Sequence, residues 1–412
     1  MSVTFEGFEF IDGGVCAPKG FTAAGVHCGI RKNKEKLDLA LVYCDTCGEA
    51  TAVYTTNKVK GAPIAVTKAH LRDNTAQAII CNSGNANTCN ADGEIKAELM
   101  CELCAAQLKI RPEDVIVAST GVIGQVLPIE PIETALPDLA NSLSKNGNEN
   151  ACQAILTTDT RKKEFAVKFK IGETECTIGG MAKGSGMIHP NMATLLCFIT
   201  TDIVMKRDLF KRAFKQVCED TFNMVSIDGD TSTNDMATII TSKQAKNAYI
   251  YDSQSLEYET FVNALYVVMM NLAREIARDG EGATKLLECA VGSARDTKIA
   301  KAVAKSVITS NLFKCAMFGE DANWGRILCA IGYTKGIHDV SGISVRLSSS
   351  NGTIEVCKNG AGVEFSEERA AKILSADTIK ILIELNEGTA SALAWGCDLT
   401  YDYIKINGDY RT

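Results

Sequence analysis

A stretch rich in glycine and proline gives way in a single step to apolar residues near the middle of the chain. The stretch runs from Met181 to Ala193 as MAKGSGMIHPNMA, and the run TLLCFITTD follows from Thr194. Gly and Pro interrupt regular structure, whereas a continuous apolar run predicts a strand buried on both faces. The pattern therefore predicts a hydroxyl residue, Thr194, at the first position of a core strand.

Two interpretations of Thr194 follow from its chemistry. β-branched residues favour strands, so a Thr in this place needs no function. The alternative is that its hydroxyl attacks the carbonyl of Ala193, and that cleavage frees an α-amine that serves as the base. Such an amine has a reference pKa of about 7.7–8.0, so it needs no histidine partner near neutral pH. The pattern alone leaves both interpretations open.

Composition limits the class of protein. With 412 residues, 46% of them hydrophobic, the chain is long enough for a globular α/β body of two or three subdomains. The net charge of -7 comes from interspersed Lys, Arg, Asp and Glu, which argues against a nucleic-acid partner. The first residues do not resemble an export signal and no run is long enough to cross a bilayer, so we expect a cytoplasmic location and no membrane contact.

Metal chemistry receives little support from the sequence. The chain has 17 cysteines, many of them within apolar runs, and only four histidines. Two CxxC pairs, Cys44 with Cys47 and Cys101 with Cys104, raise a zinc site as an alternative, but they lie too far apart for a usual zinc module. We therefore expect reduced core cysteines and no metal.

Several segments show the periodicity of regular structure. Residues 165–171 alternate as a strand does, and residues 343–347 precede an Asn351-Gly352 hairpin signal. Apolar residues recur at helical spacing over 209–217 and 261–276. The predicted fold class is α/β (α+β), with helices packed on sheets.

The stretch before Thr194 resembles the cleavage-site signature of the ornithine acetyltransferase (ArgJ) family. Further matches to that family occur in order along nearly the whole chain: STGVIGQVLP at 119–128, TTDT at 157–160, SIDGDTSTND at 226–235, EGATK at 281–285, FGEDANWGRIL at 318–328 and the terminal NGDYRT. The resemblance implies a layered, DmpA-like sandwich of helices on mixed sheets with N-terminal-nucleophile chemistry.

The resemblance also implies roles for particular residues. Cleavage between Ala193 and Thr194 would give an α chain of residues 1–193 and a β chain of residues 194–412, with Thr194 as nucleophile. Thr120 and Gly121 match the family's oxyanion pair, a hydroxyl and a backbone N–H suited to a developing alkoxide. The residues implied to bind substrate are Thr157, Lys183, Thr194, Glu281, Asn407 and Thr412.

The reaction implied is transfer of the acetyl group from N2-acetyl-L-ornithine to L-glutamate through an acetyl-threonine, as a step of arginine biosynthesis. No cofactor is needed, although some family members also use acetyl-CoA as a substrate, and the sequence leaves that activity open. Family members are similar to one another in assembling two α and two β chains. Lys183 is expected to meet the substrate carboxylate, and Glu281 its ammonium group.

Two alternatives from other classes remain. A related self-cleaving aminopeptidase or amidase would share the threonine nucleophile and pass the acyl group to water. A non-catalytic structural protein would carry Thr194 only as a strand residue and would stay uncleaved.

Overall fold

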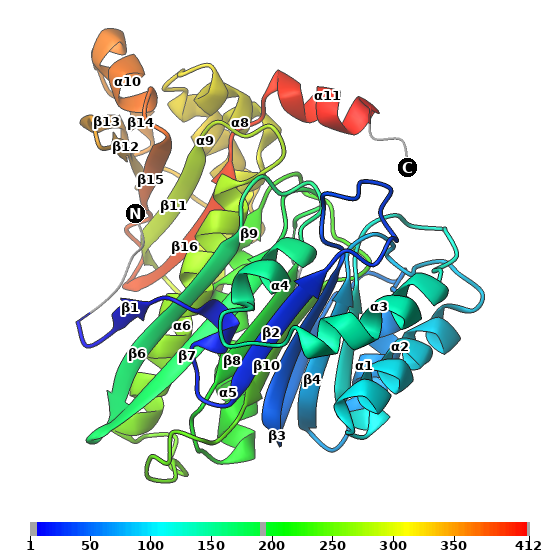
Figure 1. Ribbon diagram of the computed structural model, residues 1–412. Helices are drawn as coiled ribbons and strands as arrows, with labels where there is room; N and C mark the ends of the chain where they lie inside the picture. Colours follow the sequence, from blue (N-terminus) through cyan, green and yellow to red (C-terminus); the bar gives the residue numbers. More distant parts are fainter. Residues whose placement is uncertain (1–5, 190–194, 410–412) are drawn as a thin grey trace. The chain divides into compact units, whose positions relative to one another are not determined.

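The computed structural model describes residues 6–189 and 195–409 and divides them into two compact units, each a mixture of helices and strands (Figure 1). Unit 1 comprises Met1–Gly184, Pro190–Phe222 and Thr231–Leu272, and unit 2 comprises Ser185–His189, Asn223–Asp230 and Ala273–Thr412. Ala193, Thr194 and Thr412 lie outside the described residues. The units do not follow the predicted cleavage point, because each takes residues from both predicted chains.

Unit 1 is built on a mixed sheet with nine strands among the described residues, in the order β1-β6-β7-β8-β10-β3-β4-β5, with β2 also paired to β3. The strands are β1 (Glu9–Ile11), β2 (Phe21–Val26), β3 (Leu39–Tyr54), β4 (Thr75–Asn82), β5 (Val115–Ser119), β6 (Lys163–Ile171), β7 (Thr174–Lys183), β8 (Leu196–Thr201) and β10 (Met236–Thr241). The helices are α1 (Ala62–His70), α2 (Gly93–Leu108), α3 (Glu130–Asn141), α4 (Asn148–Ala154), α5 (Arg207–Asp220) and α6 (Leu256–Arg278), whose last residues belong to unit 2. Short 3-10 turns occur at Gly14–Cys16, Pro112–Asp114 and Phe222–Met224.

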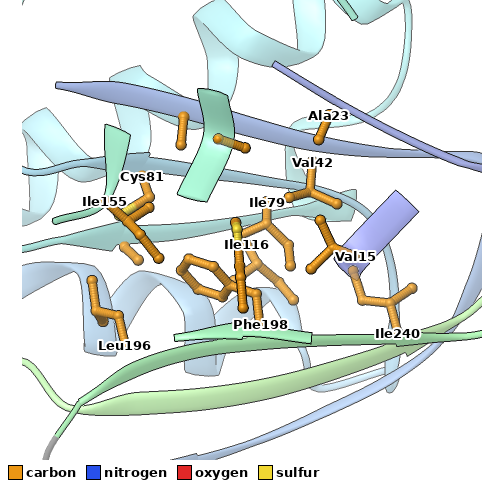
Figure 2. Close-up of a cluster of buried hydrophobic side chains, with 14 of the residues drawn as sticks. Val15, Ala23, Val42, Ile79, Cys81, Ile116, Ile155, Leu196, Phe198 and Ile240 are labelled. Carbon is orange, nitrogen blue, oxygen red and sulfur yellow. The ribbon is translucent and has the colours of Figure 1, made fainter. Parts of the chain in front are cut away.

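The long strand β3 belongs to both halves of this sheet. Its residues 50–54 pair with β10, whereas its residues 39–44 pair with β2, and a register shift interrupts its pairing with β4 between Tyr43 and Gly48. A bulge of this kind bends a strand and increases its twist. Side chains from the two halves consequently meet in one apolar cluster, in which Phe198 of β8 packs with Ile79 and Ile116 (Figure 2).

Alternating residues of the strands supply two separate cores. On β4, Ile79 and Cys81 belong to the cluster between the sheet halves, whereas Ala78 and Ile80 belong to a second cluster with helices α1, α2 and α3. On the opposite side, Gly180 of β7 lies close to side chains of α6. The layers are therefore helices, sheet half, sheet half and helices, which confirms the predicted sandwich of helices on mixed sheets.

Strand β8 is the predicted core strand, and all of its residues are buried. It lies between β7 and β10, pairing antiparallel with the first and parallel with the second. Among the described residues it begins at Leu196, and Leu195 before it is not part of the strand. The predicted first position, Thr194, lies outside the described residues.

Unit 2 has its own mixed sheet, ordered β14-β13-β12-β15-β11-β16-β9. Its strands are β9 (Val225–Ser226), β11 (Leu286–Ala294), β12 (Ser344–Ser349), β13 (Gly352–Lys358), β14 (Ala361–Gly362), β15 (Thr378–Glu384) and β16 (Ala390–Cys397). Its helices are α7 (Thr297–Thr309), α8 (Asn311–Phe318), α9 (Trp324–Gly332), α10 (Glu367–Leu374) and α11 (Tyr401–Asp409). Helix α7 packs on β11 and β16.

The local predictions are confirmed. The predicted strand at 165–171 is β6, and the hairpin at Asn351-Gly352 joins the antiparallel strands β12 and β13. The two helical stripes lie on α5 and α6 and are buried.

Most of the cysteines are buried, and none forms a disulfide within the described chain. No helix in residues 6–189 or 195–409 is long and apolar enough to cross a membrane.

Candidate active site

Thr120 and Gly121, the implied oxyanion pair, directly follow the buried strand β5. The N–H of Thr120 donates to the carbonyl of Asn82 at 2.9 Å, which continues the pairing of β4 with β5 by one residue. No described residue accepts a hydrogen bond from the N–H of Gly121. That N–H is consequently available to an outside acceptor, which an oxyanion-hole donor requires.

Gly121 cannot be replaced without moving backbone. Its φ of +125° lies in a region that residues with a Cβ rarely adopt. A Cβ added there would stand 2.6 Å from the carbonyl carbon of Gly84 and 2.8 Å from the nitrogen of Asn85. The turn therefore depends on glycine twice, once for its conformation and once for the close approach of the 84–85 backbone.

Asparagine side chains hold this turn in place. Asn82 donates to the hydroxyl of Ser119 at 2.7 Å and accepts from the N–H of Asn85 at 3.0 Å. Asn234 donates to the carbonyls of Ala86 and Ser119. A buried amide can both donate and accept, so these side chains satisfy backbone groups that the strand ends leave unpaired.

Lys183 ends strand β7 and hydrogen-bonds Thr120. Its Nζ donates to Oγ1 of Thr120 at 3.4 Å. Because an ammonium group only donates, Oγ1 must be the acceptor, and the hydroxyl proton of Thr120 is left free to be donated elsewhere. Burial lowers the pKa of Lys183, and the nearby charge of Asp159 partly opposes that effect.

Thr157 is joined to the same group through Asp159. Oδ2 of Asp159 accepts from the N–H of Thr157 at 3.0 Å and from its hydroxyl at 3.4 Å, and Oδ1 accepts from the N–H of Gly184 at 2.7 Å. The predicted residues Thr120, Thr157 and Lys183 thus lie in one connected polar cluster of unit 1, although more than sixty residues separate Thr120 from Lys183 in the chain.

The two remaining described candidates meet in unit 2. The side-chain nitrogen of Asn407, on α11, donates to Oε2 of Glu281 at 2.9 Å and to the carbonyl of Tyr403 at 3.0 Å. Glu281 in turn approaches Gly186 closely, since a Cβ at Gly186 would stand 2.5 Å from the carboxyl carbon. The N–H of Glu281 donates to the carbonyl of Ser185 at 2.8 Å.

Asp228 holds the residues that follow Ser185 and Gly186 in unit 2. Its two carboxylate oxygens accept from the N–H groups of Met187 at 2.6 Å and Ile188 at 2.9 Å. The N–H of Ile227 donates to the carbonyl of Ile188 at 2.7 Å. Three segments that carried the resemblance, around 185–189, 226–228 and 281, therefore meet in one place.

Sequence reasoning missed the residues that support these clusters. Asp159 stood unremarked inside TTDT, and the asparagines of the segment CNSGNANTCN, residues 81–90, were not singled out. A density of Asn directly after an apolar strand is a usable signal, because a buried strand end needs partners for its backbone. Asp159 offered no such signal, because its link to Lys183 runs through Gly184, which is 25 residues away in the chain.

Metal ligands do not converge within the described ranges, where no group of three or more His, Cys, Asp or Glu residues could hold an ion. Burial raises the pKa of the Cys104 thiol to about 12, and it also raises the pKa of the Cys101 thiol well above its usual value.

The chain is similar to known proteins over nearly its whole length. The ArgJ family model matches residues 22–412. The arginine biosynthesis bifunctional protein ArgJ 1 of Clostridium acetobutylicum is 48% identical over 393 residues, covering 95% of this chain and 96% of that protein. The corresponding protein of Caldanaerobacter subterraneus is 46% identical over 405 residues, covering 98% and 100%.

Among solved structures, the arginine biosynthesis bifunctional protein ArgJ of Bacillus halodurans is 41% identical, with a TM-score of 0.49, and covers 52% of this chain and 98% of that one. The family model and the relatives match nearly the whole chain. This layered α/β protein, which has a polar cluster at its strand ends, therefore belongs to the ArgJ family.

The contact of Gly121 with the 84–85 backbone predicts the effect of a single methyl group. Gly121→Ala should lose about 1–3 kcal/mol of stability beyond the cost of its backbone conformation, because the added carbon overlaps backbone atoms. Gly124→Ala is the matched control, since Gly124 also has a positive φ but has no heavy atom within 4 Å of its added carbon. Denaturant unfolding of both variants measures the difference, and equal losses would show that the close approach is unimportant.

Proposed function

We propose that the protein transfers the acetyl group of N2-acetyl-L-ornithine to L-glutamate, with Thr194 as the nucleophile of a self-cleaved chain. The observation that carries the proposal is the similarity over nearly the whole chain to arginine biosynthesis bifunctional proteins. The polar cluster of Thr120, Gly121 and Lys183 supports it, because it offers donors of the kind that acyl transfer requires.

Self-cleavage comes first in the proposed sequence of steps. Oγ1 of Thr194 attacks the carbonyl carbon of Ala193, and the bond from that carbon to the Thr194 nitrogen breaks, which leaves an ester. Water hydrolyses the ester to the Ala193 carboxylate and the free hydroxyl. The α-amine released on Thr194 is then the general base for the transfer reaction.

Acetyl transfer repeats the same chemistry on substrate. The Thr194 hydroxyl gives its proton to the α-amine and attacks the acetyl carbonyl, and ornithine leaves with that proton, so an acetyl ester remains. The amine of glutamate then attacks the ester and restores the hydroxyl. In both halves an oxyanion develops, for which the Thr120 hydroxyl and the Gly121 N–H are the proposed donors.

Charge complementarity supports a role for the remaining residues. Oε1 of Glu281 has no hydrogen-bond partner among the described residues, while Oε2 is held by Asn407, so the carboxylate has a free oxygen for a substrate ammonium group. Lys183 has donors beyond the one directed at Thr120, and we assign it to the substrate carboxylate. Unchanged substrate affinity in Lys183→Ala would remove that assignment.

The proposal also covers the subunit assembly, the location in the cell and a second acetyl donor. The α and β chains of one precursor stay together, with two of each in the assembly, and the enzyme acts in the cytoplasm without a cofactor. The relatives are named bifunctional, which supports acetyl-CoA as a second acetyl donor for glutamate. A self-cleaving amidase is the competing function, and it predicts hydrolysis that does not depend on glutamate.

Steady-state kinetics with varied N2-acetylornithine and glutamate tests the reaction. A covalent acetyl-enzyme predicts parallel double-reciprocal lines and, after acid quenching with labelled donor, one acetyl group on the chain that begins at Thr194. Release of ornithine without glutamate at the full rate would favour the amidase. Intersecting lines with no labelled chain would contradict the acetyl-threonine.

The oxyanion role of Thr120 predicts a loss of turnover with little change of binding. Thr120→Val keeps the shape of the side chain but removes the hydroxyl, and we expect kcat to fall by about 10²–10³-fold with KM nearly unchanged. Thr120→Ser retains the donor and should keep most of the activity. Equal activity of the Val and Ser variants would exclude the Thr120 hydroxyl as a donor to the transition state.

A further inference from the structure

A fully enclosed charged pair of unit 1 lies beside the proposed substrate residues. Nζ of Lys163 is 2.7 Å from Oδ1 of Asp159, and both side chains have 0% exposure. Lys163 also donates to the carbonyl of Arg161 at 3.3 Å. Burying two charges in this way is costly, and a paired burial is often no more stable than an apolar one, so stability alone does not account for it.

The hydrogen bonds of Asp159 connect it to residues of the candidate active site. Besides bonding Lys163, Asp159 accepts hydrogen bonds from the N–H and hydroxyl of Thr157 and from the N–H of Gly184. Gly184 is the residue that follows Lys183 in the chain. One carboxylate therefore fixes both the backbone that carries Thr157 and the end of β7 that carries Lys183. Lys183 in turn reaches Thr120 at 3.4 Å.

From these contacts, and on the basis of the proposed function, we infer that Asp159 is a positioning residue that sets the place of Thr157 and Lys183 for substrate binding. Lys163 is its counter-ion, and it keeps the carboxylate ionised and in place. Neither side chain needs to touch substrate, because both are enclosed. This role differs from structural support alone, because the negative charge of Asp159 also acts on the ammonium group of Lys183.

The charge of Asp159 acts on Lys183 in a direction that can be measured. Burial raises the pKa of Asp159, but Lys163, Lys183 and the hydrogen bonds lower it more, so the group stays ionised well below neutral pH. For Lys183, burial lowers the pKa, Asp159 raises it, and Lys163 lowers it. Asp235 also acts to raise it, as does the Cys81 thiol when ionised. Removing the Asp159 charge therefore lowers the pKa of Lys183, and removing the Lys163 charge raises it.

The test compares Lys163→Met with the double variant Lys163→Met/Asp159→Asn. These two proteins differ only at position 159, where Asn has no charge and has one acceptor oxygen in place of two. The double variant removes the Lys163 ammonium together with the carboxylate, whereas Asp159→Asn alone leaves that enclosed ammonium without its counter-ion and could fail to fold. The readout is the pH dependence of acetic anhydride labelling at Lys183, followed by mass spectrometry of its peptide. This reaction needs no acetyl-transfer activity, so it tests the network even if the proposed function is wrong.

We expect the labelling midpoint of Lys183 to lie above that of the wild type in Lys163→Met and to move to lower pH in the double variant. The double variant should also raise KM for N2-acetylornithine by about tenfold or more, since displaced binding groups are costly. Identical midpoints in the two variants would overturn the inference, as would a double variant with wild-type KM in an enzyme that transfers acetyl groups.

Discussion

Burial of both faces of the central strands is the constraint on which unit 1 depends. Alternate residues of β4 face two different cores, one shared between the sheet halves and one shared with helices. Strand β8 is enclosed in the same way along its whole length. Polar side chains cannot lie along such strands without losing hydration, so they gather where the strands end. The candidate site lies there for that reason.

At those ends the chain has to satisfy backbone groups that no further strand can pair. Asparagines do this beside the Thr120-Gly121 turn, and carboxylates do it where β7 ends at Lys183 in unit 1 and at residues 187–188 in unit 2. Each of these groups places a donor or acceptor at the edge of a closed core, where electrostatic interactions are stronger than in water. The chemistry proposed for the protein uses such a setting, because it relies on an alkoxide stabilised by fixed dipoles.

Local sequence patterns were sufficient to predict several elements and the α/β fold class. Strand β6, the hairpin of β12 and β13, and the buried stripes of α5 and α6 follow from periodicity, which depends only on neighbouring residues. The start of β8 at Leu196 could not be predicted in this way, because Leu195 suits a strand as well as the residues that follow it. The grouping of Thr120, Thr157 and Lys183 also exceeds local pattern, since it arises from the pairing of distant strands. Asp159 shows the limit most clearly, because Thr157 and Lys163 are its neighbours in the sequence but its link to Lys183 depends on Gly184, which the fold brings to it.

The central claim is that the chain activates Thr194 by cutting itself. The denatured intact mass of freshly purified protein, measured beside a Thr194→Ala variant, tests it most directly. The account predicts two chains for the wild type, the second beginning at Thr194, and a single 44.2 kDa chain for the variant. A wild-type protein that also stays whole would contradict it, because the α-amine that is proposed to act as the base would then never be released.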